Sequence, residues 1–137
     1  MIGAKELIKF SDRIRILYVE DDEKLREDTG RLLGTFFKNL TLAENGRIAM
    51  EKYKPGEFDI VISDFVMPEM DGMELTRQIK AIDKDQVLII LSAHDELHFV
   101  EEFRAAGVDD FIFKPLNIKE FIDTMHKACL AVTEKKD

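Results

Sequence analysis

Residues 58–64 read Phe-Asp-Ile-Val-Ile-Ser-Asp, a short and almost wholly apolar run that ends in a carboxylate. Runs of this length that are rich in β-branched residues are typical of strands buried on both faces of a sheet. Four further runs of the same kind lie at residues 14–19, 40–43, 87–91 and 109–113. Together with residues 58–63, they predict five buried strands.

Longer segments with helical spacing of their apolar residues separate these runs. They cover residues 25–36, 46–53, 75–82, 97–103 and 118–132. A strand followed by a helix, repeated five times, indicates βαβ units that build a parallel sheet covered on both faces. The predicted fold class is therefore α/β, a doubly wound (βα)5 arrangement with a five-stranded parallel sheet.

Composition limits the range of functions. The chain has 137 residues, a net charge of −8 and one cysteine, Cys129, so an internal disulfide or a multi-cysteine metal site is excluded. The lack of a basic excess argues against binding of a nucleic-acid backbone. No apolar run approaches the ~18 residues of a membrane span, and the first residues lack the apolar core of a signal peptide. We expect a soluble, cytoplasmic protein without a nucleic-acid or membrane partner.

The repeating pattern suggests one domain over residues 14–132, with a charged tail at residues 133–137. Residues 1–13 fall outside it as an N-terminal extension or linker. Within them Leu7, Ile8 and Phe10 could form a short helix or a docking arm. Segments of this kind are more often frayed ends or linkers, and the sequence favours that interpretation.

Polar side chains follow the predicted strands at their carboxyl ends, which lie on one edge of a parallel sheet. These segments are Glu20-Asp21-Asp22-Glu23, Ser63-Asp64, Ser92-Ala93 and Lys114-Pro115. Two carboxylates ~4 Å apart repel by ~1 kcal/mol in water and by up to ~4 kcal/mol near a protein surface. A cation among them would remove that repulsion, and oxygen ligands without His or Cys indicate Mg²⁺ first. Such a site suits a phosphoryl group.

Ordinary structural roles are open to some of these residues. Asp22 and Glu23 suit the start of a helix, where acids interact favourably with the helix dipole. Lys114 could extend its amine into solvent from a strand end. Asp64 fits such a role poorly, because a lone carboxylate that ends an apolar strand is more often functional.

Four motifs in order resemble a response-regulator receiver domain of bacterial two-component signalling, over about residues 14–132. They are Val19-Glu20-Asp21-Asp22, the run from Asp64 through Met67-Pro68 to Asp71-Gly72, Leu91-Ser92-Ala93, and Phe111-Ile112-Phe113-Lys114-Pro115. The resemblance implies a flavodoxin-like fold with strand order 2-1-3-4-5. It also implies a signalling phosphoacceptor rather than an enzyme, with a cis peptide bond before Pro115.

The resemblance assigns a role to each matching position. Asp64 would accept a phosphoryl group from a phosphohistidine. Glu20 and Asp21 would hold Mg²⁺ with Asp64 and the backbone carbonyl of Val66, although a shift of one residue would make Asp21 and Asp22 the acidic pair. Lys114 would then pair with the bound phosphoryl group.

Three more positions concern the response to phosphorylation. Ser92 would donate a hydrogen bond to the phosphoryl group, and Phe111 would be the aromatic switch residue that moves into the space Ser92 leaves. The affected face would comprise the helix of residues 97–103, the strand of residues 109–113 and the helix of residues 118–132. Val66 and His94 would tune the lifetime of the phosphoryl group.

The resemblance also implies partners. A histidine kinase or a histidine phosphotransfer protein would supply the phosphoryl group, and a downstream effector protein or domain would bind the switched face. A phosphorylation-dependent dimer is a further possibility. The cognate kinase, the signal and the output cannot be read from the residues.

Three other interpretations compete with this one. A Mg²⁺-dependent phosphatase with an aspartyl nucleophile has similar chemistry, but it usually carries a second acid where this chain has Val66. A receiver-like scaffold that does not switch would not need the full set of site residues. His94 and His98 have the spacing of a zinc-protease helix, but Asp95 stands where the motif has Glu, so solvated helix residues fit better.

Overall fold

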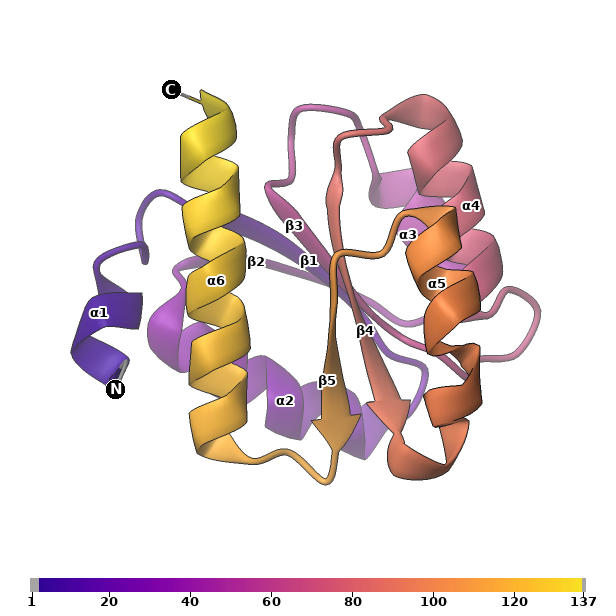
Figure 1. Ribbon diagram of the computed structural model, residues 1–137, viewed down its shortest axis with the longest axis horizontal. Coiled ribbons are helices and arrows are strands. Elements are labelled where there is room, and N and C mark those ends of the chain that lie inside the picture. Colours follow the sequence, from indigo (N-terminus) through magenta and orange to yellow (C-terminus); the bar gives the residue numbers. More distant parts are fainter. Residues whose placement is uncertain (1–2, 137) are drawn as a thin grey trace.

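The computed structural model describes residues 3–136, except for the side chains of residues 94, 95, 135 and 136. The strands span Arg15–Val19 (β1), Asn39–Ala43 (β2), Ile60–Asp64 (β3), Val87–Ala93 (β4) and Asp110–Lys114 (β5). The α-helices span Ala4–Ile8 (α1), Glu23–Phe36 (α2), Gly46–Lys52 (α3), Gly72–Ile82 (α4), Val100–Ala106 (α5) and Ile118–Lys136 (α6). A 3-10 helix, η1, spans His94–Phe99 and leads directly into α5 (Figure 1).

The strands form one parallel sheet in the order β2-β1-β3-β4-β5, which confirms the predicted fold and strand order. Strand β3 lies at the centre, where Val61 pairs with Leu17 of β1 and Leu88 of β4. Because the sheet is parallel, every strand delivers its carboxyl end to the same edge. The peptide bond between Lys114 and Pro115 at this edge is cis, as the resemblance implied.

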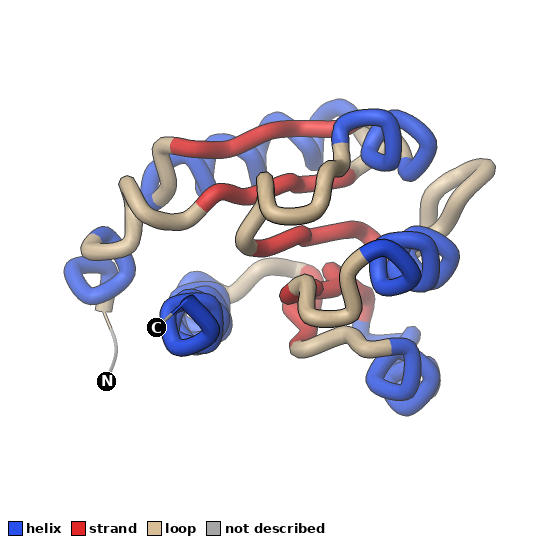
Figure 2. Tube along the Cα trace, turned by 90° about the horizontal axis from the view of Figure 1, so that it is seen from above, coloured by secondary structure: helices blue, strands red, loops and turns tan. Residues whose placement is uncertain are grey.

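Helices cover both faces of the sheet, as the view from above shows (Figure 2). Side chains alternate between the faces along each strand, so Ile16 and Tyr18 of β1 pack with α2 and α6, whereas Leu17 and Val19 pack with α3 and α4. A third apolar cluster packs α5 against β4 and β5. This burial on both faces explains why the strands are continuous apolar runs.

Helices α2, α3 and α4 each begin with a side chain that caps the first turn. Asp22 accepts a hydrogen bond from the Leu25 N–H, and Asn45 and Asp71 do the same for the helices they precede. Such caps satisfy N–H groups that a helix leaves unpaired at its start. They also fix where the loops at the functional edge of the sheet end.

Residues 3–13 are not a frayed end, so the favoured interpretation of this segment was wrong. Helix α1 lies beside α6 (Figure 1), and Leu7 and Phe10 are buried in the same cluster as α2 and α6. The Phe10 ring meets that of His126 edge to face at 5.7 Å. An ion pair of 2.9 Å between Lys38 and Asp12 adds an exposed contact. Leu7 and Phe10 therefore complete the core.

Two boundaries near the functional edge also differ from the prediction. Strand β4 continues past Leu91 to Ala93, because Ser92 and Ala93 still pair with β5. The helix predicted over residues 97–103 is divided into η1 and α5. Residues 133–136 continue α6. Over the described range, the structure contains no helix with the length and hydropathy needed to cross a membrane.

Candidate functional site

Asp64 is the last residue of β3, and its carboxylate lies at the carboxyl edge of the sheet. It is only 6% exposed, because β1 and β4 flank the strand on both sides. Lys114, the last residue of β5, reaches across β4 and places its Nζ 2.6 Å from Asp64 Oδ1. The structure thus brings together two residues that lie 50 positions apart in the sequence.

Glu20 and Asp21 follow β1 directly and join Asp64 in one acidic cluster. One carboxylate oxygen from each of the three residues lies within 4.8 Å of the others. Glu20 is 1% exposed, whereas Asp21 is open to solvent. Asp22 instead caps α2 with its side chain. The geometry therefore favours Glu20 and Asp21 over the pair shifted by one residue.

The cluster perturbs the protonation of its members. Burial, with the nearby charge of Asp64, raises the pKa of Glu20 to about 7. Burial also raises the pKa of Asp64, although the ammonium of Lys114 opposes that shift. Burial is the largest influence on Lys114 and would lower its pKa, but the hydrogen bond to Asp64 and the surrounding carboxylate charges together outweigh it, so the net shift is upward. Lys114 is thus held in its charged form beside a crowded acidic pair.

Two residues that the sequence analysis did not single out hold Glu20 in place. The hydroxyl of Tyr18 donates to Glu20 Oε1 at 3.5 Å, and Arg26 Nη1 donates to the Glu20 carbonyl oxygen at 2.9 Å. Tyr18 was detectable as a polar group in an apolar strand, two residues before Glu20 and therefore on the same face. Arg26 gave no such signal, because its contact depends on how α2 packs.

Ser92 lies on β4 beside the cluster and is 3% exposed. Its hydroxyl donates to Glu96 Oε1 at 3.2 Å and to the Ala93 carbonyl oxygen at 3.3 Å. The same Glu96 oxygen accepts from the Ala93 N–H at 2.7 Å. Glu96 was also missed, although a Glu three residues after a helix N-cap is the acidic half of a capping box.

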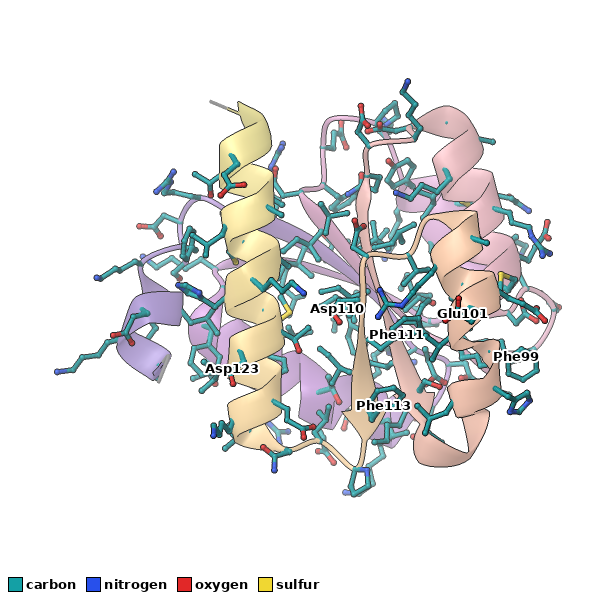
Figure 3. The ribbon with its side chains drawn as sticks, in the orientation of Figure 1. Phe99, Glu101, Asp110, Phe111, Phe113 and Asp123 are labelled. Carbon is teal, nitrogen blue, oxygen red and sulfur yellow. The ribbon has the colours of Figure 1, made fainter. Side chains whose placement is uncertain are left out.

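Phe111 on β5 is buried against Phe103 of α5, with ring centroids 5.9 Å apart. The Arg104 guanidinium lies 5.5 Å from the centre of the Phe111 ring. Figure 3 shows Phe111 and Phe113 on the α5 side of β5 and Asp110 on the α6 side. The proposed switch residue therefore already packs between β5 and α5.

Val66 and His94 are the two positions expected to tune the lifetime of the phosphoryl group. The side chain of Val66 is 65% exposed, two residues beyond Asp64. The side chain of His94 lies outside the described residues. Because residues 94–99 form a 3-10 helix with about three residues per turn, positions 94 and 98 do not share a face. This geometry does not support the zinc-protease interpretation.

A pocket of about 240 Å³ opens beside the cluster, between α2 and the loop that follows β5. Its lining includes the charged residues Glu20 and Lys114 and the side chains of Leu25, Thr29 and Leu116. The pocket therefore reaches Glu20 and Lys114 from the α2 side of the sheet.

The donor set fits a hard divalent cation. The three clustered carboxylates offer only oxygen ligands, and two of them are buried side by side with a single ammonium near them. Within the part of the chain that the structure describes, no other group of His, Cys, Asp and Glu is close enough to share an ion. Mg²⁺ prefers such carboxylates and keeps open positions for phosphate oxygens.

Known proteins share this sequence pattern. The family model of the response regulator receiver domain matches residues 16–126. The response regulator MprA of Mycolicibacterium vanbaalenii is 33% identical over 124 residues, which cover 90% of this chain and 53% of that protein. A cyclic di-GMP phosphodiesterase of Thermotoga maritima is 36% identical over 104 residues, 76% of this chain and 28% of that protein. The chain thus spans about half of MprA.

Solved structures share the fold. The crystal structure of a response regulator receiver domain protein from Clostridium thermocellum matches with a TM-score of 0.80 at 23% identity, over 90% of this chain and 97% of that one. The strand order, the family model and the curated relatives agree. The chain therefore belongs to the response regulator receiver domain family.

Proposed function

We propose that this receiver domain accepts a phosphoryl group from a phosphohistidine on the carboxylate of Asp64. The observation that carries the proposal is the 2.6 Å contact between Asp64 and Lys114 within a cluster that also holds Glu20 and Asp21. The histidine would belong to a kinase or a phosphotransfer protein. A pocket lined by Glu20 and Lys114 opens beside this cluster, between α2 and the loop after β5.

In the transfer, one Asp64 oxygen attacks phosphorus and forms the O–P bond of an acyl phosphate. The P–N bond of the donor breaks, and the imidazole nitrogen leaves with the electron pair and takes up a proton. Lys114 keeps its positive charge and follows the negative charge from the carboxylate to the phosphoryl oxygens. Ser92 donates its hydroxyl hydrogen to one of these oxygens.

Glu20, Asp21, Asp64 and the backbone carbonyl of Val66 would hold Mg²⁺. When bound, the ion supplies positive charge that offsets the clustered carboxylates and the phosphoryl oxygens. In the absence of the ion, protonation of Glu20 reduces the repulsion between the carboxylates, because its pKa of about 7 lets it keep a proton near neutral pH.

Phosphorylation would shift the population between two packings of the face formed by α5, β5 and α6. Ser92 would turn toward the phosphoryl group, and Phe111 would repack behind it. Since Phe111 has no hydroxyl, this switch would depend on packing alone. The switched face would bind an effector protein or domain, or a second copy of the chain.

A phosphatase has less support from the geometry. The position two residues after Asp64, where such an enzyme places its second acid, carries the exposed valine Val66. Turnover of a small phosphate ester would be the measurement that favours it.

The direct test of the proposed function is incubation with acetyl phosphate and Mg²⁺, followed by intact-mass measurement. We expect a mass gain of one phosphoryl group that is absent in Asp64→Asn. Asp22→Asn is the matched control, because Asn caps a helix about as well as Asp and the residue lies at the same edge. It should be phosphorylated like the wild type. Phosphorylation that persists in Asp64→Asn would refute the assignment of Asp64.

A further inference from the structure

Glu96 joins Ser92 to the first turn of η1 through a single carboxylate oxygen. Oε1 accepts from the Ser92 hydroxyl at 3.2 Å and from the Ala93 N–H at 2.7 Å. Ala93 is the N-cap of η1 and has no polar side chain, so Glu96 provides the cap hydrogen bond recorded at this end. The buried Ser92 hydroxyl near the carboxyl end of β4 is therefore tied to the segment that leads into α5.

This hydrogen bond competes with the bond that a phosphoryl group would need. A serine hydroxyl carries one hydrogen, which here points to Glu96 and the Ala93 carbonyl. A bond from that hydrogen to a phosphoryl oxygen on Asp64 would draw it away from Glu96. Glu96 also acts on Lys114, since its negative charge is among those that favour the charged ammonium. One carboxylate thus interacts with two groups that would bind the phosphoryl group.

We propose that Glu96 is a positioning residue that holds the Ser92 hydroxyl until a phosphoryl group on Asp64 displaces it. The proposal rests on the proposed phosphoacceptor function of Asp64. When Ser92 turns away, the Glu96 carboxylate loses one of the two hydrogen bonds that hold it at the start of η1. Because η1 continues directly into α5, this loss is a route from the site to the face that packs on Phe111.

A plain capping role for Glu96 is the competing explanation. It accounts for the Ala93 N–H bond, and loss of the Glu96 charge would in any case favour an anion nearby. Neither effect requires the Ser92 hydroxyl. A double-mutant cycle between positions 92 and 96 therefore separates the two explanations.

The cycle measures binding of beryllofluoride with Mg²⁺, since beryllofluoride is a stable tetrahedral substitute for a phosphoryl group on a carboxylate. We expect Glu96→Ala to tighten binding roughly three- to tenfold more in the Ser92 background than in the Ser92→Ala background. Glu96→Gln keeps an acceptor oxygen without the charge and should give an intermediate effect. Glu101→Gln is the matched control: it removes one charge from α5, outside the contacts of Ser92, and Figure 3 shows it away from β5.

The results separate failure of this inference from failure of the proposed function. Equal tightening in both backgrounds, within about twofold, would overturn the role of Glu96 while leaving the function of Asp64 intact. If the wild type binds no beryllofluoride and gains no mass with acetyl phosphate, the proposed function fails and this inference with it.

A second measurement needs no substitution and so avoids any effect on folding. In the wild type, beryllofluoride should shift the amide proton resonance of Ala93, because the Glu96 oxygen that accepts from this N–H would no longer be shared with Ser92. An Ala93 resonance that does not move when the ligand saturates the protein would overturn the proposal.

Discussion

At the scale of single residues, the buried carboxylates of the site lower the stability of the metal-free protein when they are charged. Glu20 is 1% exposed and lies beside a second buried carboxylate, so its charged form is disfavoured in the folded state. Its pKa is about 7 in the folded protein against 4.5 for the unperturbed group. Between these values the unfolded chain releases a proton that the folded protein keeps. The contribution of Glu20 to stability is therefore fully present below about pH 4.5 and is lost as the pH rises through 7.

The substitution Glu20→Gln should remove this loss of stability at high pH. Without metal, we expect the variant to exceed the wild type in free energy of unfolding by about 2–3 kcal/mol more at pH 8 than at pH 5, since one pKa unit is worth about 1.4 kcal/mol. Mg²⁺ should stabilise the wild type but not the variant. Urea unfolding at both pH values, with and without EDTA, tests this. Asp21→Asn is the matched control because its carboxylate is exposed, and an equal pH-dependent gain there would contradict the role of burial.

At the scale of elements, α1 is the helix whose contribution to the core differs most from the sequence-based expectation. Leu7 is fully buried in the cluster that α2 and α6 share, whereas its neighbour Ile8 is half exposed. Leu7→Ala should lower the free energy of unfolding by about 2–4 kcal/mol, and Ile8→Ala should change it by well under 1 kcal/mol. Denaturant unfolding of the two variants checks this. Equal costs would show that α1 does not belong to the core in solution.

Elements were predictable where one local pattern determines them. The five apolar runs became strands because burial on both faces requires that composition. The strand ends then placed Asp64 and Lys114 at one edge by topology alone. Helix α1 was not predictable, since five residues carry too little periodicity to outweigh the tendency of chain ends to fray. Glu96 was missed because its bond to Ser92 depends on a 3-10 turn that helical spacing does not reveal.

At the scale of the whole molecule, the sheet keeps the charged site apart from the surface that would respond to it. The carboxyl edge collects the charged groups, while α5 and α6 flank β5 on the face that would report their state (Figure 1). Phe111 connects the two, because it lies on β5 three residues before Lys114 and packs on Phe103 of α5. A change at the edge can reach α5 through Glu96 and η1 or through this ring.

Hydrogen exchange of the whole chain would test this connection. Addition of beryllofluoride and Mg²⁺ should alter amide exchange in η1, α5 and β5 and leave α3, on the far side of α4, unchanged. Phe111→Leu should reduce the response of α5 at least about twofold while protection near Asp64 persists, because the shorter side chain loses its ring contact with Phe103. Phe58→Leu, which removes a ring stacked on Tyr53 instead, is the control and should respond like the wild type. An undiminished response of α5 in Phe111→Leu would show that the signal bypasses the ring and leave the route through Glu96 as the one to examine.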